Sequence, residues 1–297
     1  MTSEEPWTVK RILDWTISFL KERGSSTPRL DAEVLLAHAR KCRRIQLYTQ
    51  FDQPLTDEQR TVMRELVKRR AAAEPVAYLV GHREFFSLDF QVRPGVFIPR
   101  PDTESLVLAA LDVLKDKPSP RVLELCSGTG CIPIAIAKNH PTARLTTVEI
   151  SPQVIEVTRL NVQQHQLEQR IEVLSGNLFE PIPAESQFDL IVSNPPYVQQ
   201  GEIEGLAADI RDHEPHLALD GGPDGLDVIR ILVQESPARL QPGGTLMFEL
   251  SPEQAADAMQ LLTQAGFEHV EARNDLAGQA RVVAGKRRSG NTVRPSG

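Results

Sequence analysis

The residues of this chain with the clearest chemical potential are Asn194, Pro195, Pro196 and Tyr197, which follow a short apolar run. That run, residues 189–193 (Asp-Leu-Ile-Val-Ser), predicts a buried strand. The two prolines remove backbone donors and restrict φ, so strand pairing must end there and a rigid loop follows. The loop offers an amide, carbonyl oxygens and an aromatic ring, which suit a planar, amide-like nitrogen at the strand end where open α/β sheets bind ligands. A simple strand-ending turn is the alternative, because Asn and Pro are common turn residues.

A glycine-containing stretch, Glu124-Leu-Cys-Ser-Gly-Thr-Gly130, lies between a predicted strand at 122–125 and a predicted helix at 132–138. Glycines at this point let a ligand approach the backbone amides at a helix N-terminus. A dinucleotide-binding loop would have a third glycine at position 133, where this chain has proline, so a nicotinamide cofactor is disfavoured. The sequence also has no G-x-x-x-x-G-K-[ST] loop for nucleotide phosphates.

Suitable side chains also end the next two predicted strands. Glu149 lies 19 residues after Gly130, at about the distance where a carboxylate accepts hydrogen bonds from a ribose. Asn177 and Leu178 follow a predicted strand at 171–174, where Asn177 could accept from an exocyclic amine and Leu178 could pack on an adenine face. Taken singly, Glu149 and Asn177 could each be an ordinary cap at the end of a strand, which is the alternative interpretation. Four successive strand ends with suitable groups indicate a nucleoside-like cofactor that does not require phosphates.

The elements that must position these residues fall into two parts. Nothing up to about residue 82 reads as a strand, and helical spacing predicts helices near 7–23, 28–40 and 56–73. The last of these begins with a capping box, Thr56-Asp-Glu-Gln59. From Arg121 onward strands and helices alternate, which predicts a mostly parallel sheet covered by helices. Two final strands, near 267–272 and 280–284, are close enough in sequence to form an antiparallel edge.

These patterns predict four segments. They are a helical domain at 1–82, a β-hairpin linker at 83–100 with strands at 84–92 and 96–98, a catalytic domain at 101–286 and a disordered tail at 287–297. Two prolines flank Arg100 at the end of the hairpin and hold its guanidinium in place. That cation is a candidate for binding an anionic part of a substrate, and a plain helix entry is the alternative.

Composition and charge narrow the classes of function. The net charge of −7 disfavours a general nucleic-acid binder, although residues 1–83 carry 15 Lys and Arg against 11 Asp and Glu. That mildly basic part either steers toward a ribosomal or RNA-associated partner or is an ordinary solvated surface. No apolar run approaches the roughly 18 residues of a membrane span, and the N-terminus lacks a signal core. Three cysteines without metal spacing predict a cytoplasmic protein with no metal site.

The combined motifs resemble class I S-adenosylmethionine-dependent methyltransferases, of the type that methylates planar amino groups. Within that class the chain is similar to the HemK/PrmC family, the peptide chain release factor glutamine N5-methyltransferases. The resemblance spans about residues 8–285 and also rests on 97–104 (Phe-Ile-Pro-Arg-Pro-Asp-Thr-Glu) and 214–227 (Glu-Pro-His-Leu-Ala-Leu-Asp-Gly-Gly-Pro-Asp-Gly-Leu-Asp). It implies a Rossmann-like, mostly parallel seven-stranded sheet with a small helical domain that recognises the substrate.

The resemblance also assigns roles. It implies that Asn194, Pro195, Pro196 and Tyr197 are catalytic and bind the substrate glutamine of a Gly-Gly-Gln motif, with Arg100 as a further substrate contact. It implies a cofactor site for S-adenosylmethionine, and for S-adenosylhomocysteine as product, made of the following residues: Glu124, Cys126, Ser127, Gly128, Thr129, Gly130, Glu149, Asn177, Leu178 and Asn194. The expected partner is a release factor. The chain itself is expected to be a monomer that needs neither nucleic acid nor a membrane.

The chain departs from the family pattern at four positions of the cofactor site. The family usually has Asp-Leu-Gly where this chain has 124–126 (Glu-Leu-Cys), and Asp in place of Glu149 and Asn177. Glu keeps the charge, and the Asn carbonyl can still accept from an amine. Cys126 in place of Gly is expected to narrow the pocket or change the local φ.

The expected reaction is methyl transfer to an amide nitrogen without an evident general base. His213 and His216 are candidates for that base, and a surface or structural role is the alternative for each. Three rival functions remain open: a ribosomal-protein glutamine methyltransferase, a DNA adenine methyltransferase, and a non-catalytic adapter that binds cofactor and a translation factor.

Overall fold

A computed structural model describes residues 6–275 and 277–289, and these form two compact units. The first consists of residues up to His82 together with Ala207–His213, and the second of Arg83–Leu206 and the residues from Glu214 on. The sequence places 207–213 in the catalytic domain, but the structure groups this segment with the helical unit. The contacts of Arg70, given below, supply the physical reason.

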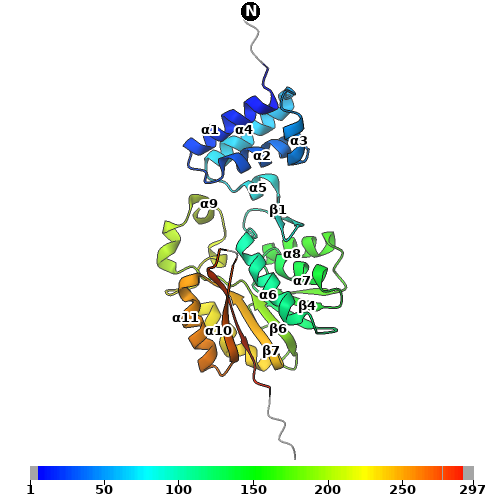
Figure 1. Cartoon of the computed structure of the whole chain (residues 1–297), viewed down its shortest axis with the longest axis vertical. Coiled ribbons are helices and arrows are strands. Elements are labelled where there is room, and N and C mark those ends of the chain that lie inside the picture. Colours follow the sequence, from blue (N-terminus) through cyan, green and yellow to red (C-terminus); the bar gives the residue numbers. More distant parts are fainter. Residues whose placement is uncertain (1–5, 276, 290–297) are drawn as a thin grey trace, which may run out of the picture. The chain divides into compact units, whose positions relative to one another are not determined.

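The first unit is made of helices; in Figure 1 those before residue 82 are blue to cyan and the short one at 208–211 is yellow-green. Its helices are α1 (Val9–Glu22), α2 (Pro28–Ala39), α3 (Arg44–Thr49), α4 (Asp57–Ala71), α5 (Val76–Val80) and α9 (Ala208–Arg211). The three long helices agree with the predicted ones, and Thr56 and Gln59 form the predicted capping box with two hydrogen bonds of 3.2 Å. The core joins apolar residues of α1, α2 and α4, such as Leu20, Leu35 and Leu66.

A buried ion cluster fastens the short helix α9 to this unit. The Arg70 guanidinium, from α4, donates to Asp31 at 2.7 Å and to Asp209 at 3.4 Å. It also donates to the carbonyl oxygens of Ala73 and Glu74. A buried guanidinium needs such partners because an unpaired charge away from water is costly. Asp209 is one of these partners, and its segment therefore belongs with the helices.

The predicted hairpin is present with different bounds. Its strands are β1 (His82–Phe85) and β2 (Leu88–Gln91), and the turn lies at Phe86 and Ser87, with φ of 51° and 58°. The predicted strand at 96–98 is wrong, because those residues form no strand. Two central residues with positive φ define a tight hairpin turn, normally filled by Asn and Gly. Phe and Ser do not indicate such a turn in the sequence, which therefore predicts the hairpin too late in the chain.

The second unit contains a seven-stranded sheet in the order β5-β4-β3-β6-β7-β9-β8. Neighbours from β5 to β7 are parallel, whereas β9 is antiparallel to both β7 and β8. The strands are β3 (Arg121–Leu125), β4 (Arg144–Glu149), β5 (Ile171–Ser175), β6 (Phe188–Ser193), β7 (Leu240–Glu249), β8 (Glu268–Asn274) and β9 (Ala280–Lys286). The predicted seven-stranded, mostly parallel sheet with an antiparallel edge is confirmed.

Helices cover both faces of this sheet. In Figure 1, α10 and α11 lie on one face and α6, α7 and α8 on the other. Their bounds are α6 (Glu104–Leu114), α7 (Cys131–Asn139), α8 (Pro152–Gln164), α10 (Asp227–Arg239) and α11 (Ala255–Gln264), with 3-10 turns at η1 (Pro101–Thr103), η2 (Gln200–Gly205), η3 (His216–Ala218) and η4 (Pro252–Gln254). Side chains alternate along β6, so Leu190 and Val192 join one core and Ile191 the other. Both cores hold the strands rigid beneath the loops at their carboxyl ends.

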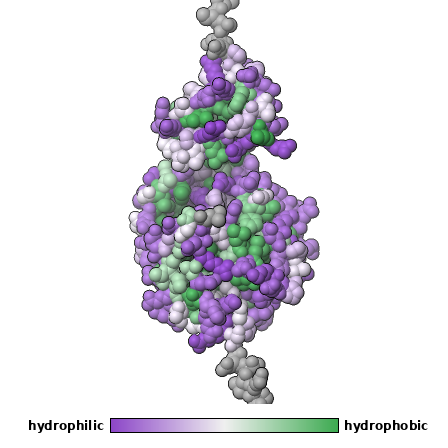
Figure 2. Space-filling model, viewed as in Figure 1, coloured by the Kyte–Doolittle hydropathy of each residue, from purple (hydrophilic) through white to green (hydrophobic). Residues whose placement is uncertain are grey.

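The predicted tail lies partly outside the described residues, which stop at Ser289. Arg287, predicted to lie in that tail, extends the pairing of β9 with β7: its backbone N–H donates to Gly244 O at 2.8 Å. None of the helices in the described part of the chain has the length and apolarity to cross a membrane. Figure 2 shows hydrophilic residues spread over the visible face, with hydrophobic ones in smaller patches.

Candidate active site

A pocket opens at the carboxyl ends of β3, β4, β5 and β6. The chain runs from β3 outward to β4 and β5, and then returns to place β6 on the other side of β3. Ligands bind at such a reversal because the loops of the two central strands diverge there. Predicted site residues that line this pocket are Cys126, Ser127, Gly128, Thr129, Glu149, Asn177, Leu178, Asn194, Pro195, Pro196 and Tyr197. The fold thus brings the two predicted groups together across the strand reversal.

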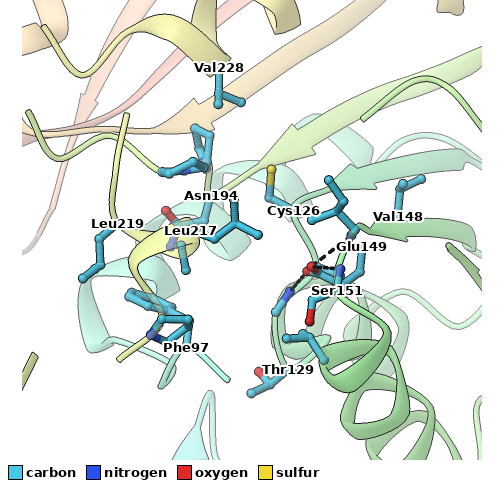
Figure 3. Close-up of a pocket in the computed structure, with 18 of the residues that line it drawn as sticks. Phe97, Cys126, Thr129, Val148, Glu149, Ser151, Asn194, Leu217, Leu219 and Val228 are labelled. Carbon is cyan, nitrogen blue, oxygen red and sulfur yellow. Dashed lines mark hydrogen bonds between the residues drawn. The ribbon is translucent and has the colours of Figure 1, made fainter. Parts of the chain in front are cut away.

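The pocket has two sides, as Figure 3 shows. Glu149, Ser151 and Thr129 lie on one side, which we call the donor side, after the residues predicted to bind the methyl donor. Asn194 lies on the other side, the acceptor side, with Leu217 and Phe97.

Glu149 is held on the donor side by the backbone. Its Oε1 accepts the N–H groups of Ile150 and Ser151, both at 3.0 Å, and its Oε2 accepts that of Gly128 at 3.0 Å. The side chain therefore joins the end of β4 to the glycine-containing loop after β3. A carboxylate has about four lone-pair sites, and these three bonds leave one of them on Oε2.

The loop after β3 bends through left-handed backbone conformations. Gly128 and Gly130 have φ of 56° and 78°, and Cys126 shares this region with φ of 63°. Cys126 thus has a backbone conformation that glycine favours, and its side chain lines the pocket. Burial, with the nearby Glu149 charge, raises the pKa of the Cys126 thiol to about 12. It is therefore a neutral wall of the pocket rather than a nucleophile.

The end of β5 completes the donor side. Leu178 has φ of 47° and lines the pocket beside Asn177, whose side chain is exposed. The Gly176 N–H donates to the Glu149 carbonyl at 3.0 Å, which ties this loop to the end of β4. Both residues are thus at the position that the sequence predicts, and their contacts with a cofactor stay a prediction.

Three predicted site residues lie elsewhere than the pocket lining. Glu124 is fully buried beneath it and accepts a hydrogen bond from Thr147. Burial raises the pKa of Glu124 to about 8, so it is mostly neutral at pH 7. Gly130 is the residue that caps the N-terminus of α7 and is not in the pocket lining. Arg100 pairs with the buried Glu214 and its guanidinium lies 4.9 Å from the Phe97 ring centre, which gives it structural partners of its own.

On the acceptor side, side chains hold the loop. The Asn194 Nδ2 donates to Thr103 Oγ1 at 3.2 Å, and the Tyr197 hydroxyl donates to Glu249 at 3.1 Å. The Gln254 amide donates to the Tyr197 carbonyl at 2.8 Å. Because Asn194 uses its N–H group on Thr103, its Oδ1 is the end left to accept from a ligand. Burial raises the pKa of Tyr197, so the ring stays a neutral hydrogen-bond donor.

The stretch at 214–227 supports this loop by close packing. A Cβ on Gly225 would lie 2.3 Å from the Tyr197 carbonyl oxygen, and one on Gly221 would lie 2.8 Å from the Tyr197 Cα. Only glycine fits where two backbones approach this closely. Sequence reasoning also missed other lining residues, among them Gly95, Phe97, Thr103, Pro215, Leu217 and Leu219. Most of these residues lie in the two stretches that carry the family resemblance, 97–104 and 214–227, and that resemblance could have indicated them.

Comparison with known proteins decides the family. The family model described as PrmC N-terminal domain matches residues 11–81, and the Methyltransferase small domain matches residues 87–222. A release factor glutamine methyltransferase of Rhodopirellula baltica is 44% identical over 288 residues, covering 95% of this chain and 97% of that protein. The chain belongs to the release factor glutamine methyltransferase family. A relative of the same name from Geobacter sulfurreducens is 43% identical over 95% of this chain and 98% of its own length.

Solved structures agree on the fold. The T. thermophilus 16S rRNA N2 G1207 methyltransferase, solved with AdoMet and guanosine, matches with a TM-score of 0.51 and 20% identity. It covers 70% of this chain and 50% of that one, and at this identity the likeness shows the fold alone. The predicted family and enzyme class are confirmed by the relatives, and the predicted methyltransferase fold by the solved structure. Roles of single residues stay predictions.

Proposed function

We propose that this chain transfers a methyl group from S-adenosylmethionine to the side-chain amide nitrogen of the glutamine in the Gly-Gly-Gln motif of peptide chain release factors. One observation carries the proposal: the loop suited to an amide, Asn194 to Tyr197, lines the same pocket as Glu149 and the glycine-containing loop. The names of relatives that match nearly the full chain support a release factor as the protein substrate.

The donor side fits the cofactor in its chemistry. Glu149 would accept from a ribose hydroxyl through the lone pair left on Oε2. Leu178, Val148 and Ile150 supply apolar surface for an adenine ring, and Asn177 an amide for its exocyclic amine. When bound, S-adenosylmethionine supplies a methyl group on a positively charged sulfur, which is an activated electrophile. The chain's own task is therefore to position and to activate the nitrogen that receives it.

The acceptor side deals with the weak nucleophilicity of an amide nitrogen, whose lone pair is delocalised into its carbonyl. Asn194 Oδ1 and the Pro195 carbonyl would accept the two N–H groups, which increases the electron density on that nitrogen. Tyr197 would pack against the amide plane, with its hydroxyl fixed on Glu249. Holding reacting atoms about 3–3.5 Å apart and in line removes a large part of the barrier to a bimolecular step.

Neither candidate histidine is assigned as a base. His213 belongs to the first unit, where its ring lies 3.4 Å from Ala72 O, and His216 is exposed outside the residues that line the pocket. The first unit has the helices that we assign to recognition of the release factor. The proposal further includes a cytoplasmic monomer that requires no nucleic acid, in keeping with the charge of −7.

A labelled-methyl experiment tests the proposal. The protein is incubated with labelled S-adenosylmethionine and, in separate reactions, with a release factor, large-subunit ribosomal proteins and duplex DNA. Mass spectrometry then locates the label. We expect it on the Gly-Gly-Gln glutamine of the release factor. Label on ribosomal proteins or DNA alone would replace the proposed acceptor, and cofactor binding without any transfer would favour an adapter.

A further inference from the structure

One buried amide side chain joins two segments that are far apart in the sequence. Asn161, in α8, is fully buried. Its Nδ2 donates to Thr129 O at 2.9 Å in the glycine-containing loop, and to Gln91 O at 3.1 Å in β2 of the hairpin. Its Oδ1 accepts the Gln91 N–H at 2.8 Å. Both amide protons and the amide oxygen are in use, so only this orientation of the side chain satisfies all three backbone groups.

The sequence of α7 explains why the loop needs a donor from outside. The first hydrogen bond of that helix runs from the Ile134 N–H to the Gly130 carbonyl at 3.1 Å. The equivalent donor for the buried Thr129 carbonyl would be residue 133, which is proline and has no N–H. Asn161 supplies the missing donor from the neighbouring helix. Because a buried carbonyl without a partner is costly, this bond holds the loop where α7 itself does not.

A second side chain of α8 holds the loop without touching the hairpin. Thr158 is fully buried, and its hydroxyl donates to Gly128 O at 2.8 Å, with Val154 O of its own helix at 3.1 Å as a second acceptor. Gly128 and Thr129 both line the donor side of the pocket, and the Gly128 N–H is bound by Glu149. Loss of these bonds from α8 would therefore displace groups that line the predicted cofactor site.

A third side chain of α8 holds the hairpin without touching the loop. Gln164 Nε2 donates to Asp89 O at 2.8 Å, and its Oε1 accepts the Gln91 Nε2 at 2.9 Å. Along α8, the hydrogen bonds of Thr158 thus reach the loop, those of Gln164 reach the hairpin, and those of Asn161 reach both.

We infer that Asn161 is a positioning residue that couples the hairpin to cofactor binding. Order in the Gly128 and Thr129 peptide groups also fixes the Asn161 amide, and with it the backbone of Gln91. Such coupling is reciprocal, so a hairpin that is stabilised by cofactor binding must weaken that binding when it is loosened. The inference rests on the proposed use of S-adenosylmethionine and needs no particular methyl acceptor.

The test measures the full chain with S-adenosylhomocysteine as the probe. Calorimetry gives the affinity, and hydrogen exchange of residues 83–91 is followed with and without saturating probe. In wild type we expect the probe to slow this exchange at least about fivefold. Asn161→Leu is close in size but cannot form hydrogen bonds. It should weaken binding on the order of 10- to 100-fold, and the probe should no longer slow exchange in 83–91.

Two further variants separate the coupling from local damage. Thr158→Val should weaken binding about 3- to 10-fold, while the probe still slows exchange in the hairpin. Gln164→Ala removes no contact of the loop, yet should weaken binding about two- to fivefold because the hairpin is looser. When Gln164→Ala is added to Asn161→Leu, affinity should fall no further, since the connection is already broken.

The neighbouring Gln163 is the matched control. It is exposed and its side chain forms no hydrogen bond with the described part of the chain, so Gln163→Ala should change neither quantity. Wild-type affinity in Gln164→Ala, or slowing of hairpin exchange by the probe in Asn161→Leu, would overturn the inference. If Asn161→Leu does not fold, the affinity of Gln164→Ala and the exchange of wild type decide alone.

Failure of the inference is distinguishable from failure of the proposed function. A wild-type chain that binds no S-adenosylhomocysteine would refute the proposed cofactor site, and this inference with it. Absence of methyl transfer to a release factor would refute only the proposed acceptor, because the measurements on Asn161 and Gln164 include no acceptor.

Discussion

The donor and acceptor sides of the pocket are held by different means. On the donor side, one carboxylate, Glu149, is fixed by three backbone N–H groups. On the acceptor side, the side chains of Thr103, Glu249 and Gln254 hold the loop from Asn194 to Tyr197. Backbone donors are present whatever the sequence, so the donor side depends on few residue identities. The acceptor side depends on several particular side chains, and we expect it to be the more sensitive to substitution.

The largest effect is expected at the acceptor side. Asn194→Ala removes the carbonyl that would accept from the substrate amide, and should lower kcat by at least about 100-fold, as for loss of a preorganised hydrogen-bonding group. Cofactor affinity should change by less than about threefold. Transfer of labelled methyl to a release factor and calorimetric binding of S-adenosylmethionine measure the two quantities. Near-normal turnover would remove Asn194 from the mechanism.

At the donor side we expect a smaller effect of the opposite kind, in which cofactor affinity falls and kcat is kept. Glu149→Ala removes the ribose acceptor and the anchor of three backbone groups, and should weaken cofactor binding about 10- to 100-fold, as for loss of a charged hydrogen bond. At saturating cofactor, kcat should stay within a few-fold of wild type. Glu149→Gln is the control: it keeps one acceptor oxygen, and we expect it to weaken cofactor binding less than Glu149→Ala does. If kcat fell in Glu149→Ala as it does in Asn194→Ala, the division into two sides would be wrong.

Packing beneath the acceptor loop offers a third test. Gly225→Ala places a Cβ 2.3 Å from the Tyr197 carbonyl oxygen, at a residue whose φ is 74°. The loop must move, and we expect a loss of kcat on the order of tenfold, because small misplacements of positioning groups are costly. Gly201→Ala is a matched control, since its Cβ would have nothing within 4 Å. Equal kcat in the two variants would show that the Tyr197 backbone can be displaced without loss of activity.

The last expected effect is on the stability of the protein and not on its activity, and it concerns Glu124, which is buried beneath the donor side. The folded-state pKa of Glu124, raised by burial to about 8, exceeds the ordinary value of 4.5. The folded protein therefore keeps a proton that the unfolded chain loses, and this stabilising contribution declines as pH rises from about 4.5 to 8. Glutamine does not titrate, so Glu124→Gln should gain about 2–4 kcal/mol relative to wild type between pH 5 and pH 9. Chemical denaturation at both pH values measures it. A constant difference would mean that Glu124 is charged when folded.

Sequence alone predicts the parts of this molecule that follow from local pattern. Apolar runs and alternation indicate the strands, and polar residues after them indicate the pocket, because parallel strands bring their carboxyl ends to one edge. What it misses depends on contacts between distant residues. Glu249 reads as an ordinary strand residue until the sheet register brings it beside Asn194. Arg100 reads as a free cation until Glu214 pairs with it. The turn at Phe86 and Ser87 has none of the usual turn residues.

The attachment of Ala207–His213 to the helical unit has a consequence for truncation. Residues on either side of this segment, Val198 before it and Pro215 after it, line the pocket. A fragment that begins at Arg83 would lack Arg70, the partner of Asp209, so Ala207–His213 would lose the ion pair that holds it. Excision of the first unit would thus affect the second unit as well. The remaining fragment would keep its sheet and cofactor loops while one wall of its pocket became free to unfold locally.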